Sequence, residues 1–216
     1  TSRGILVTNY PDFCITDMAE HTMALLLVAS RQILPMDAAT RAGEWDARVR
    51  IPFHRIAGQR LGLLGYWRIA RAVAVRAAAF GMSVAYHDPF VTPHKISAVS
   101  FDELLTTSDY LSLHVPLNEQ TRHMISEPQF QKMKPTAVLI NTSRGSIVDE
   151  RALVTALSEG WIAGAGLDVY EELNMFTLPP SPPAHPLLSM KKVGLTPHSG
   201  GCSMESLDEL MREGAR

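Results

Sequence analysis

The chain has 216 residues, of which 46% are hydrophobic, and a formal net charge of −2. This length can bury a sizeable core and suits one domain plus part of another. The small net charge gives no reason to expect a nucleic-acid or membrane-surface partner. Two cysteines are too few for a disulfide framework and indicate a reducing, cytoplasmic compartment. The longest apolar stretch, from Met23 to Ser30, is too short to span a bilayer.

The first part of the chain favours one short strand and two helices. We expect a strand over residues 4–8, a long apolar helix over residues 17–33 capped by Thr16, and a second helix over residues 35–45. The apolar helix must bury its side chains against something, and a partner subunit is one candidate. No signal peptide is visible, and the chain begins with Thr1 instead of Met, so we expect it to begin within a longer protein.

From residue 61 onward, expected strands and helices alternate. The strands are short apolar runs at residues 61–64, 83–87, 110–115, 137–142, 162–169 and 193–197. The helices begin near Ile69, Ser100, Ser126, Asp149 and Ser203. Glu103 completes a capping box with Ser100, and Gly160 marks a helix end. The Pro-rich residues 178–186 are expected to form a surface loop. This alternation predicts a doubly wound parallel sheet.

Residues 61–74, LGLLGYWRIARAVA, have the local signature of a dinucleotide site: a buried strand, a Gly-rich turn and a helix. In the usual G-x-G-x-x-G pattern, the first Gly permits the turn, the second lets the backbone approach a pyrophosphate, and the third lets the helix pack on the strand. Here Gly65, Trp67 and Ala70 occupy these positions. Ala is tolerated at the third. An indole at the second would stand where the phosphates lie unless it swings out of the groove.

The second strand of this unit ends in Asp88, 23 positions beyond Gly65. An acidic residue at about this separation bonds the ribose hydroxyls of the cofactor. Because no Arg stands beside it, Asp88 favours NAD over NADP. Taken alone, Asp88 and Pro89 could equally be a turn that ends a strand. The strand, turn and helix before them favour the dinucleotide site.

Polar residues follow the ends of the later strands: His114, Asn141 to Arg144, Asp168 and His198. In an open α/β sheet the ligand crevice lies outside the carboxyl ends of the strands, where the strand order reverses. Each residue alone has a structural alternative, such as bonding loop carbonyls. Four of them on one rim favour a binding site. No metal is expected, because His185 and His198 lack the clustered companions that ligation needs.

Five segments in register resemble the D-isomer-specific 2-hydroxyacid dehydrogenases. They are AEHTMAL at 19–25, HVPL at 114–117, INTSRG at 140–145, AGLDVYE at 165–171 and LTPH at 195–198. The resemblance extends from about Gly4 to the C-terminus. That family comprises NAD(P)-dependent enzymes, usually dimers, in which a Rossmann nucleotide domain is inserted in a flavodoxin-like catalytic domain.

The resemblance implies a division of the chain into three parts. Residues 1–15 would be a remnant of the catalytic domain, at the N-terminus. Residues 16–200 would be the NAD-binding Rossmann domain with connector and dimer-arm helices, and residues 201–216 a helix leading back toward the catalytic domain. A homodimer is implied for the full-length form.

The resemblance also implies an NAD-dependent oxidoreductase that transfers hydride between the nicotinamide and a small 2-hydroxy or 2-oxo acid. Arg144 would hold the substrate carboxylate or carbonyl, since a guanidinium stays charged and forks onto oxygen pairs. His198 would give or take the proton. The implied cofactor-binding residues are Gly65, Arg68, Ile69, Asp88, Val115, Pro116, Thr121, Thr142, Ser143, Arg144 and Asp168.

One catalytic position departs from the family pattern. The family has a Glu five positions beyond the Asp of its G-L-D-V motif, which orients the catalytic His and raises its pKa. Here that position is Leu173. Leu cannot accept the imidazole proton, so His198 would be less well oriented. Glu171 or Glu172 could replace it only if residues 174–183 change the local path, and the register argues against this.

Two hypotheses follow. The first is an oxidoreductase domain that is active once supplied with the rest of its catalytic domain. The second is a catalytically impaired Rossmann scaffold kept for nucleotide sensing or dimerisation. Trp67 and Leu173 are the departures expected of such a scaffold. The choice of 2-hydroxy acid lies outside what these residues determine.

Overall fold

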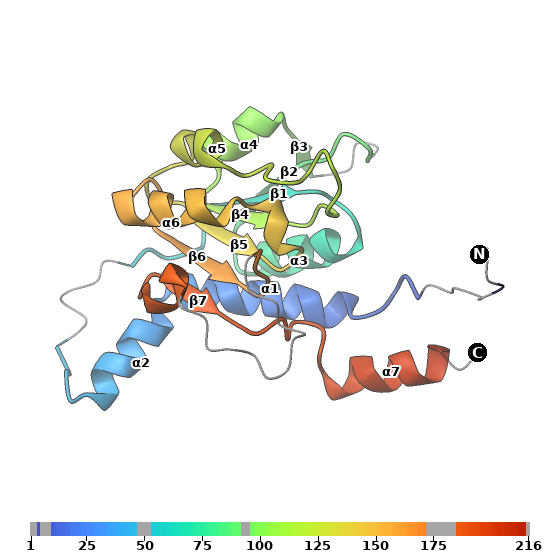
Figure 1. Ribbon diagram of the computed structural model, residues 1–216, viewed down its shortest axis with the longest axis horizontal. Helices are drawn as coiled ribbons and strands as arrows, with labels where there is room; N and C mark the ends of the chain where they lie inside the picture. Colours follow the sequence, from blue (N-terminus) through green and yellow to red (C-terminus); the bar gives the residue numbers. More distant parts are fainter. Residues whose placement is uncertain (1–3, 5–9, 47–52, 92–95, 172–184, 215–216) are drawn as a thin grey trace.

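The computed structural model describes residues 4, 10–46, 53–91, 96–171 and 185–214. These residues form one sheet of seven parallel strands with helices on both faces (Figure 1). The strand order is β3-β2-β1-β4-β5-β6-β7. The strands are β1 (Arg60–Leu64), β2 (Ser83–His87), β3 (Ser97–Ala98), β4 (Tyr110–Leu113), β5 (Val138–Asn141), β6 (Gly164–Leu167) and β7 (Val193–Leu195). The predicted Rossmann-type doubly wound sheet is confirmed.

Helices cover both faces of the sheet. Figure 1 shows α4, α5 and α6 on one side and α1 and α3 on the other. The helices are α1 (Ile15–Ser30), α2 (Ile33–Arg41), α3 (Arg68–Ala79), α4 (Phe101–Thr107), α5 (Glu127–Lys132), α6 (Glu150–Glu159) and α7 (Met204–Gly214), with 3-10 turns η2 (Gly145–Ile147) and η3 (Pro186–Ser189). None of the described helices has the length and apolar character needed to cross a bilayer.

The sheet separates two apolar cores. Phe130 of α5 lies fully buried in the core beneath α4, α5 and α6, and Tyr86 of β2 lies fully buried in the core beneath α1 and α3. Every residue of β4, β5 and β6 is buried. Strands covered on both faces read as continuous apolar runs, which is why the short apolar stretches predicted these elements.

The strand order reverses between β1 and β4. The chain builds β1, β2 and β3 outward and then returns to place β4 against the free side of β1. At the carboxyl ends of these strands, the Gly65 N–H donates to the His87 carbonyl at 2.9 Å, and the His114 N–H donates to the Leu64 carbonyl at 2.7 Å. A ligand crevice is expected at this reversal.

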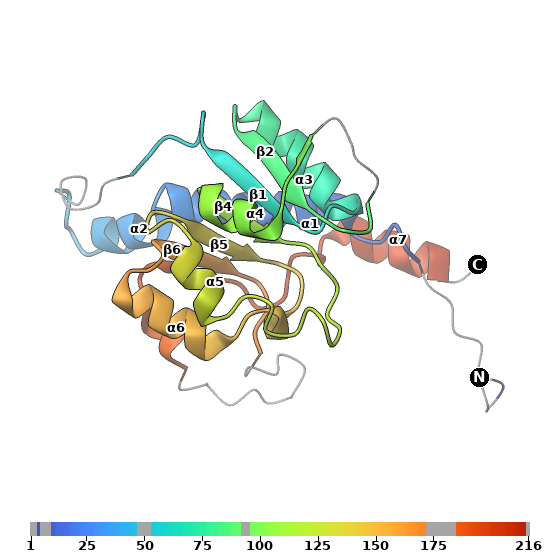
Figure 2. The ribbon, with the colours of Figure 1, turned by 90° about the horizontal axis from the view of Figure 1, so that it is seen from above.

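Two helices stand apart from the sheet. In Figure 2, α2 and α7 extend toward opposite ends of the molecule. No residue of α2 is buried, and its Ile33 and Leu34 are each 48% exposed. On α7, Met204 is 79% exposed and Met211 is 75% exposed. Both helices therefore present apolar side chains at the surface of the described chain.

The predicted ends of the first two helices are wrong. Thr16 does not cap the first helix, because α1 begins at Ile15, directly after Cys14. The first helix stops at Ser30 because Gln32 adopts a left-handed conformation with φ 54°, which starts α2 two residues before Pro35. The second helix ends at Arg41 and does not reach residue 45. The strand predicted at residues 4–8 lies almost wholly outside the described residues.

The other elements follow the prediction, with shorter strands. Strand β2 has the predicted bounds, and the Ser100 hydroxyl accepts the Glu103 N–H at 3.1 Å, as a cap requires. Asp149 caps α6, and Gly160 ends it with φ 74°. Strands β4 to β7 all stop before the predicted ends, at Leu113, Asn141, Leu167 and Leu195. Strand β3 was not predicted, because a pair of exposed residues carries no periodic pattern.

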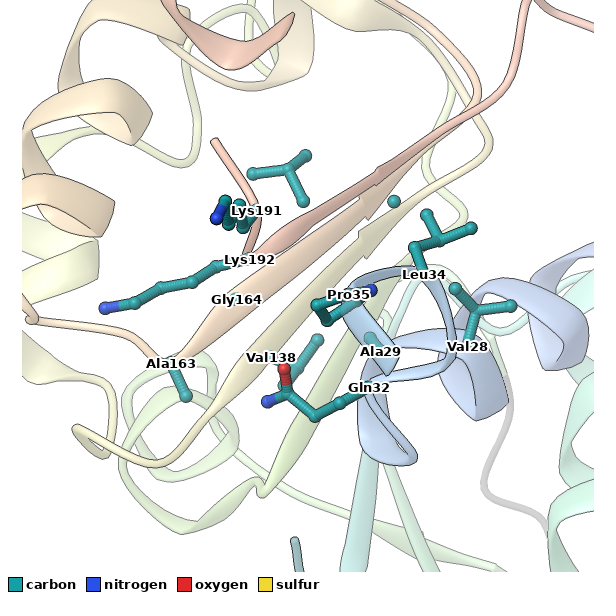
Figure 3. Close-up of a pocket in the computed structure, with 12 residues that line it drawn as sticks. Val28, Ala29, Gln32, Leu34, Pro35, Val138, Ala163, Gly164, Lys191 and Lys192 are labelled. Atoms are coloured by element: carbon teal, nitrogen blue, oxygen red, sulfur yellow. The ribbon is translucent and has the colours of Figure 1, made fainter. Parts of the chain in front are cut away.

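A small, partly open cavity lies at the opposite edge of the sheet from the crevice. Its volume is about 40 Å³, and it lies at the amino ends of β5, β6 and β7, beside Val28 of α1 and Leu34 of α2 (Figure 3). A water molecule occupies about 30 Å³ in the liquid, so this cavity is far too small for a dinucleotide.

Candidate active site

Gly65 begins the turn that follows β1. Its φ of 86° lies in the left-handed region, which favours glycine. A side chain here would also lie 2.9 Å from the carbonyl carbon of His114 and from the nitrogen of Val115. The turn is therefore packed against the end of β4, at the point of strand reversal. Both constraints account for the Gly that the sequence pattern required.

Trp67 lies on the outside of the turn. Its neighbour Tyr66 points inward and stacks on Tyr86, with ring centroids 4.1 Å apart. Trp67 therefore points outward and is 61% exposed. The guanidinium carbons of Arg68 and Arg71 each lie 5.9 Å from its ring centroid, so two cations hold the indole beside the start of α3.

Arg68 and Ile69 form the first residues of α3. The Arg68 guanidinium donates to the Pro11 carbonyl at 2.6 Å and lies 3.2 Å from an Asp12 carboxylate oxygen. Its side chain therefore holds the segment before α1, and only its backbone belongs to the turn. Ile69 is half-buried against the core beneath α3. The first turn of α3 carries no acidic residue, which leaves the positive end of the helix dipole available to an anion.

Asp88 lies directly after β2, beside the same turn. Its Oδ2 accepts the Tyr66 N–H at 2.8 Å, and its Oδ1 accepts the Phe90 N–H at 2.9 Å. The carboxylate thus forms the strand-ending turn that the sequence left open as an alternative. The same contacts hold it against the Gly-rich turn, where a ribose-binding carboxylate belongs.

The segment after β4 forms a compact turn. Thr121 closes it, since its hydroxyl donates to the Pro116 carbonyl at 2.6 Å and accepts the Asn118 N–H at 2.9 Å. Val115 is half-buried and Pro116 is exposed. His114 bonds the Ser112 hydroxyl at 2.9 Å, and burial lowers the pKa of His114 to about 4.

The segment after β5 is held by Asn141. The Asn141 Oδ1 accepts both the N–H and the hydroxyl of Ser143, and its Nδ2 donates to the Arg144 carbonyl at 3.0 Å. The Thr142 hydroxyl lies 2.9 Å from the Thr22 hydroxyl of α1. Arg144 is exposed, and its guanidinium donates to the Ser143 carbonyl at 2.6 Å. The backbone is thus fixed, while the guanidinium faces outward.

Asp168 follows β6 and its side chain is fully buried. Its Oδ1 accepts the Thr196 hydroxyl at 2.6 Å and the Ser199 N–H at 2.9 Å, and its Oδ2 accepts the Gly200 N–H at 2.9 Å. The Nε2 of His21 lies 3.3 Å from Oδ1. Burial alone would raise the pKa of Asp168, but the bonds from His21, Thr196 and the two backbone groups outweigh it and lower that pKa.

His198 lies in the turn that Asp168 holds. It is half-buried and has a left-handed backbone with φ 54°. The two residues after it, Ser199 and Gly200, donate the backbone bonds to Asp168. An open groove of about 320 Å³ lies beside this turn and is lined by Asp17, Glu20, His21, Ala24, Ser199, Gly200, Cys202 and Ser203. The fold thus carries His198 to the same edge of the sheet as Gly65 and Arg144.

Comparison with known proteins identifies this arrangement. A family model described as the NAD binding domain of D-isomer specific 2-hydroxyacid dehydrogenases matches residues 23–200. The chain belongs to this dehydrogenase family. It is 44% identical, over 214 residues, to a glyoxylate reductase from Korarchaeum cryptofilum, and the match covers 95% of this chain and 63% of the relative.

Solved structures of the family share the fold. A D-lactate dehydrogenase with NAD+ from Lactobacillus jensenii has a TM-score of 0.91 and 30% identity, covering 100% of this chain and 68% of that one. A glyoxylate reductase from Paecilomyes thermophila has a TM-score of 0.85 and 39% identity, covering 98% of this chain and 63% of that one. The chain therefore spans about two thirds of the length of these relatives.

The dehydrogenase fold of this chain fits a dinucleotide at the β1–β4 edge. Gly65 lets the turn pack closely against the end of β4, and α3 directs its N-terminus at the turn. Asp88 presents a carboxylate at the end of β2. Trp67 departs from the family pattern, but its indole lies beside α3 and is well exposed. Within the described residues, no group of three His, Cys, Asp or Glu side chains is arranged to hold a metal ion.

The sequence did not predict a second polar network, centred on Glu150 at the start of α6. Glu150 is 3% exposed, and its Oε1 accepts the Glu171 N–H at 2.6 Å, while its Oε2 lies 3.4 Å from the His185 Nε2. The Glu171 carboxylate in turn bonds the His123 Nε2 at 2.7 Å and the Arg122 guanidinium at 2.8 Å. No local pattern distinguishes Glu150 from any acidic residue in a first helical turn.

Proposed function

We propose that this chain is the nucleotide-binding part of an NAD-dependent enzyme that interconverts a small 2-oxo acid and the 2-hydroxy acid. The observation that supports this most directly is that Arg144, after β5, and His198, after β7, share the carboxyl edge of the sheet with the Gly65 turn after β1. Two of its relatives are named glyoxylate reductase and D-lactate dehydrogenase, and enzymes with these names catalyse the same class of reaction.

Arg144 is proposed to hold the substrate. A guanidinium remains charged at all working pH values and presents paired donors that match a carboxylate or a polarised carbonyl. Asn141 and the Ser143 carbonyl fix the backbone and orient the guanidinium of Arg144. The substrate is therefore oriented by a residue whose backbone cannot move freely.

His198 is proposed to give a proton to the oxygen of the reduced carbon, or to accept one from the alcohol in the reverse direction. An imidazole suits this task because its ordinary pKa lies near neutrality. NAD, when bound, supplies or accepts the hydride. Gly65 and the backbone of Arg68 and Ile69 are proposed to receive its phosphates, and Asp88 its ribose hydroxyls. Asp168 is proposed to lie at the nicotinamide end, where it holds the His198 turn.

The same proposal divides the chain into domains. Residues 16–200 are proposed as the nucleotide-binding domain with its connector and dimer-arm helices. Residues 1–15 and 201–216 are proposed as segments of a second domain, the rest of which lies in the longer protein. The exposed Ile33 and Leu34 of α2 support a homodimer, which sedimentation of the longer protein can test.

The test of function uses the longer protein with its second domain present. NADH oxidation is measured with glyoxylate, pyruvate and larger 2-oxo acids. Arg144→Lys and His198→Asn are each expected to reduce kcat/KM by about 10²-fold or more, since positioned acid–base groups contribute about 10²–10⁴-fold. Arg212→Lys and His54→Asn are the matched controls on exposed side chains and are expected to leave kcat/KM unchanged.

Trp67 and Leu173 favour a second candidate, an impaired scaffold that retains nucleotide binding or dimerisation without turnover. Leu173 lies outside the described residues. Under this candidate the longer protein binds NADH and reduces none of the 2-oxo acids. Equal rates in the unaltered protein and in His198→Asn would also support it.

A further inference from the structure

Two free cysteines lie on segments that meet beside the His198 turn. Cys14 directly precedes α1, and Cys202 lies between β7 and α7. A methyl group on Gly201, the residue before Cys202, would lie 3.1 Å from the Cys14 Sγ and 3.2 Å from its Cβ. Both views of the ribbon place the start of α1 beside the segment that leads to α7 (Figures 1 and 2).

This contact brings the backbone next to Cys202 against Cys14. The Cβ atoms of a disulfide lie about 3.8 Å apart. The 3.2 Å distance to the Cys14 Cβ is measured from position 201, and Cys202 is the next residue in the chain. Gly200 and Gly201 carry no side chains, so the turn before Cys202 can adjust without a steric clash. Formation of a disulfide requires this turn to bring the Cys202 side chain toward Cys14.

The two thiols are not equivalent. Cys202 is exposed and lines the open groove beside α1. Cys14 is half-buried, and burial, followed by the charges of Asp17 and Cys202, raises the pKa of its thiol. Since the thiolate is the nucleophile, an external oxidant meets Cys202 first.

We propose that Cys14 and Cys202 form a reversible disulfide by exchange with a low-molecular-weight disulfide such as oxidised glutathione. The Cys202 thiolate attacks one sulfur of the oxidant, its S–S bond breaks, and one glutathione thiolate leaves. Cys14 then loses its proton to solvent and attacks the Cys202 sulfur, which releases the second glutathione. Two cysteine thiols are oxidised, and one oxidised glutathione is reduced to two thiols.

The disulfide would join the start of α1 to the turn that carries His198. The Cys202 sulfur lies 3.9 Å from the His198 carbonyl oxygen, and the Ser206 hydroxyl donates to the Gly201 carbonyl at 2.7 Å. A bond at Cys202 therefore acts on a turn that is otherwise held by Asp168 and Ser206. Formation of the disulfide does not depend on the proposed dehydrogenase function, but any effect on turnover does.

Peptide mapping tests the disulfide directly. The folded chain is equilibrated in buffers with graded ratios of oxidised to reduced glutathione, quenched with acid, alkylated and digested without reduction. The expected product is one peptide pair joined through Cys14 and Cys202, about 2 Da lighter than its two reduced peptides together, and absent after treatment with dithiothreitol. If Cys202 carries only glutathione while Cys14 is alkylated at every ratio, the proposal is wrong.

Two single variants check the order of the steps. Cys14→Ser is expected to accumulate the mixed disulfide at Cys202, because no second thiol can release glutathione. Cys202→Ser is expected to leave Cys14 largely unmodified at the same ratios. Rapid modification of Cys14 in that variant would contradict the assigned order.

An activity measurement in the longer protein separates this proposal from the proposed function. Oxidation is expected to lower 2-oxo acid turnover at least about threefold, reversibly, and to leave Cys202→Ser, in which Cys14 stays largely unmodified, unaffected. A joined peptide in a protein without turnover would support the disulfide and contradict the dehydrogenase function. Turnover without a joined peptide would support the dehydrogenase function and contradict the disulfide.

Discussion

The carboxylate of Glu171 is bonded by the Nε2 of His123, with oxygen distances of 2.7 and 2.8 Å. The Arg122 guanidinium bonds the same carboxylate at 2.8 Å, and the Glu171 N–H donates to Glu150. Glu171 is one of two residues that could replace the family Glu absent at Leu173. These bonds hold its carboxylate on the turn after β4, whereas the missing Glu would have to orient His198.

We therefore expect Leu173→Glu to restore activity in the longer protein. The unaltered protein is expected to reduce 2-oxo acids slowly, because Leu173 cannot bond an imidazole. Adding Glu at this position should raise kcat at least about tenfold, at the low end of what an acid–base partner contributes. Leu173→Gln, which is similar in size and uncharged, is the control. Ordinary turnover without the change would mean that another group orients His198.

Trp67→Gly is expected to strengthen NADH binding. The exposed indole flanks the turn that must approach the phosphates, and Gly at this position also suits the N-terminus of a helix. We expect weak binding by the unaltered chain and at least about a tenfold decrease in Kd, which corresponds to about 1.4 kcal/mol. Calorimetric titration with NADH measures the Kd of the unaltered chain and of the variant. Trp45→Gly, at a residue 79% exposed and distant from the turn, is the control.

Sub-micromolar binding of NADH by the unaltered chain would contradict the idea that Trp67 obstructs the phosphates. The cation–π contacts of its indole with Arg68 and Arg71 would then be sufficient to keep the indole away from the phosphates.

Asp168→Asn is expected to destabilise the chain by about 2–4 kcal/mol. The carboxylate is fully buried and accepts three hydrogen bonds from the turn after β7. The NH2 group of an amide at this position would face these donors and could accept none of their bonds. Urea unfolding, monitored by circular dichroism, measures the loss of unfolding free energy. Asp208→Asn, on an exposed ion pair of α7, is expected to change stability by less than about 0.5 kcal/mol. Equal effects in the two variants would contradict the assigned role.

Gly145→Ala is expected to cost at least about 2 kcal/mol. A side chain on Gly145 would overlap the backbone of Tyr170 and Glu171, so the segment after β5 would have to separate from the segment after β6. Gly194→Ala is the control, because its side chain would meet Val28 and Leu25 at ordinary distances of 3.5 and 3.9 Å. Similar thermal midpoints for the two variants would exclude this close contact.

His114 is expected to make the chain less stable as the pH falls from about 6.5 toward about 4. Burial lowers the pKa of His114 to about 4 from an unfolded value of 6.5, so over this range the unfolded chain binds a proton that the folded chain does not. The contribution is present above pH 6.5 and is lost as the pH falls, with a slope of at most about 1.4 kcal/mol per pH unit. His114→Asn should remove this slope, which urea unfolding at several pH values measures. An unchanged slope would mean that other groups cause the pH dependence.

Much of the fold could be predicted from local patterns. The apolar runs of β1, β4 and β5 and the polar caps at Ser100 and Asp149 predicted most elements, because burial on both sheet faces and helix capping leave clear traces in the sequence. The ends of α1 and α2 were missed, because the left-handed conformations of Cys14 and Gln32 are not favoured by those residue types.

The sequence by itself determined the class of site. The Gly-rich turn at Gly65, the acidic residue at Asp88 and the order of the motifs through His198 are set by spacing along the chain, and the family comparison supports the same assignment. Gly65 and Asp88 lie within one βαβ unit, whose geometry follows from local conformational preferences.

Only the tertiary structure decided how the side chains are used. Trp67 swings outward because Tyr66 stacks on Tyr86 of the next strand, and Asp168 holds the His198 turn because α1, β6 and β7 converge there. The proximity of Cys14 to the turn before Cys202 has the same origin. Each of these contacts joins residues far apart in the chain, so their geometry depends on the packing of several elements and leaves no periodic trace in the sequence.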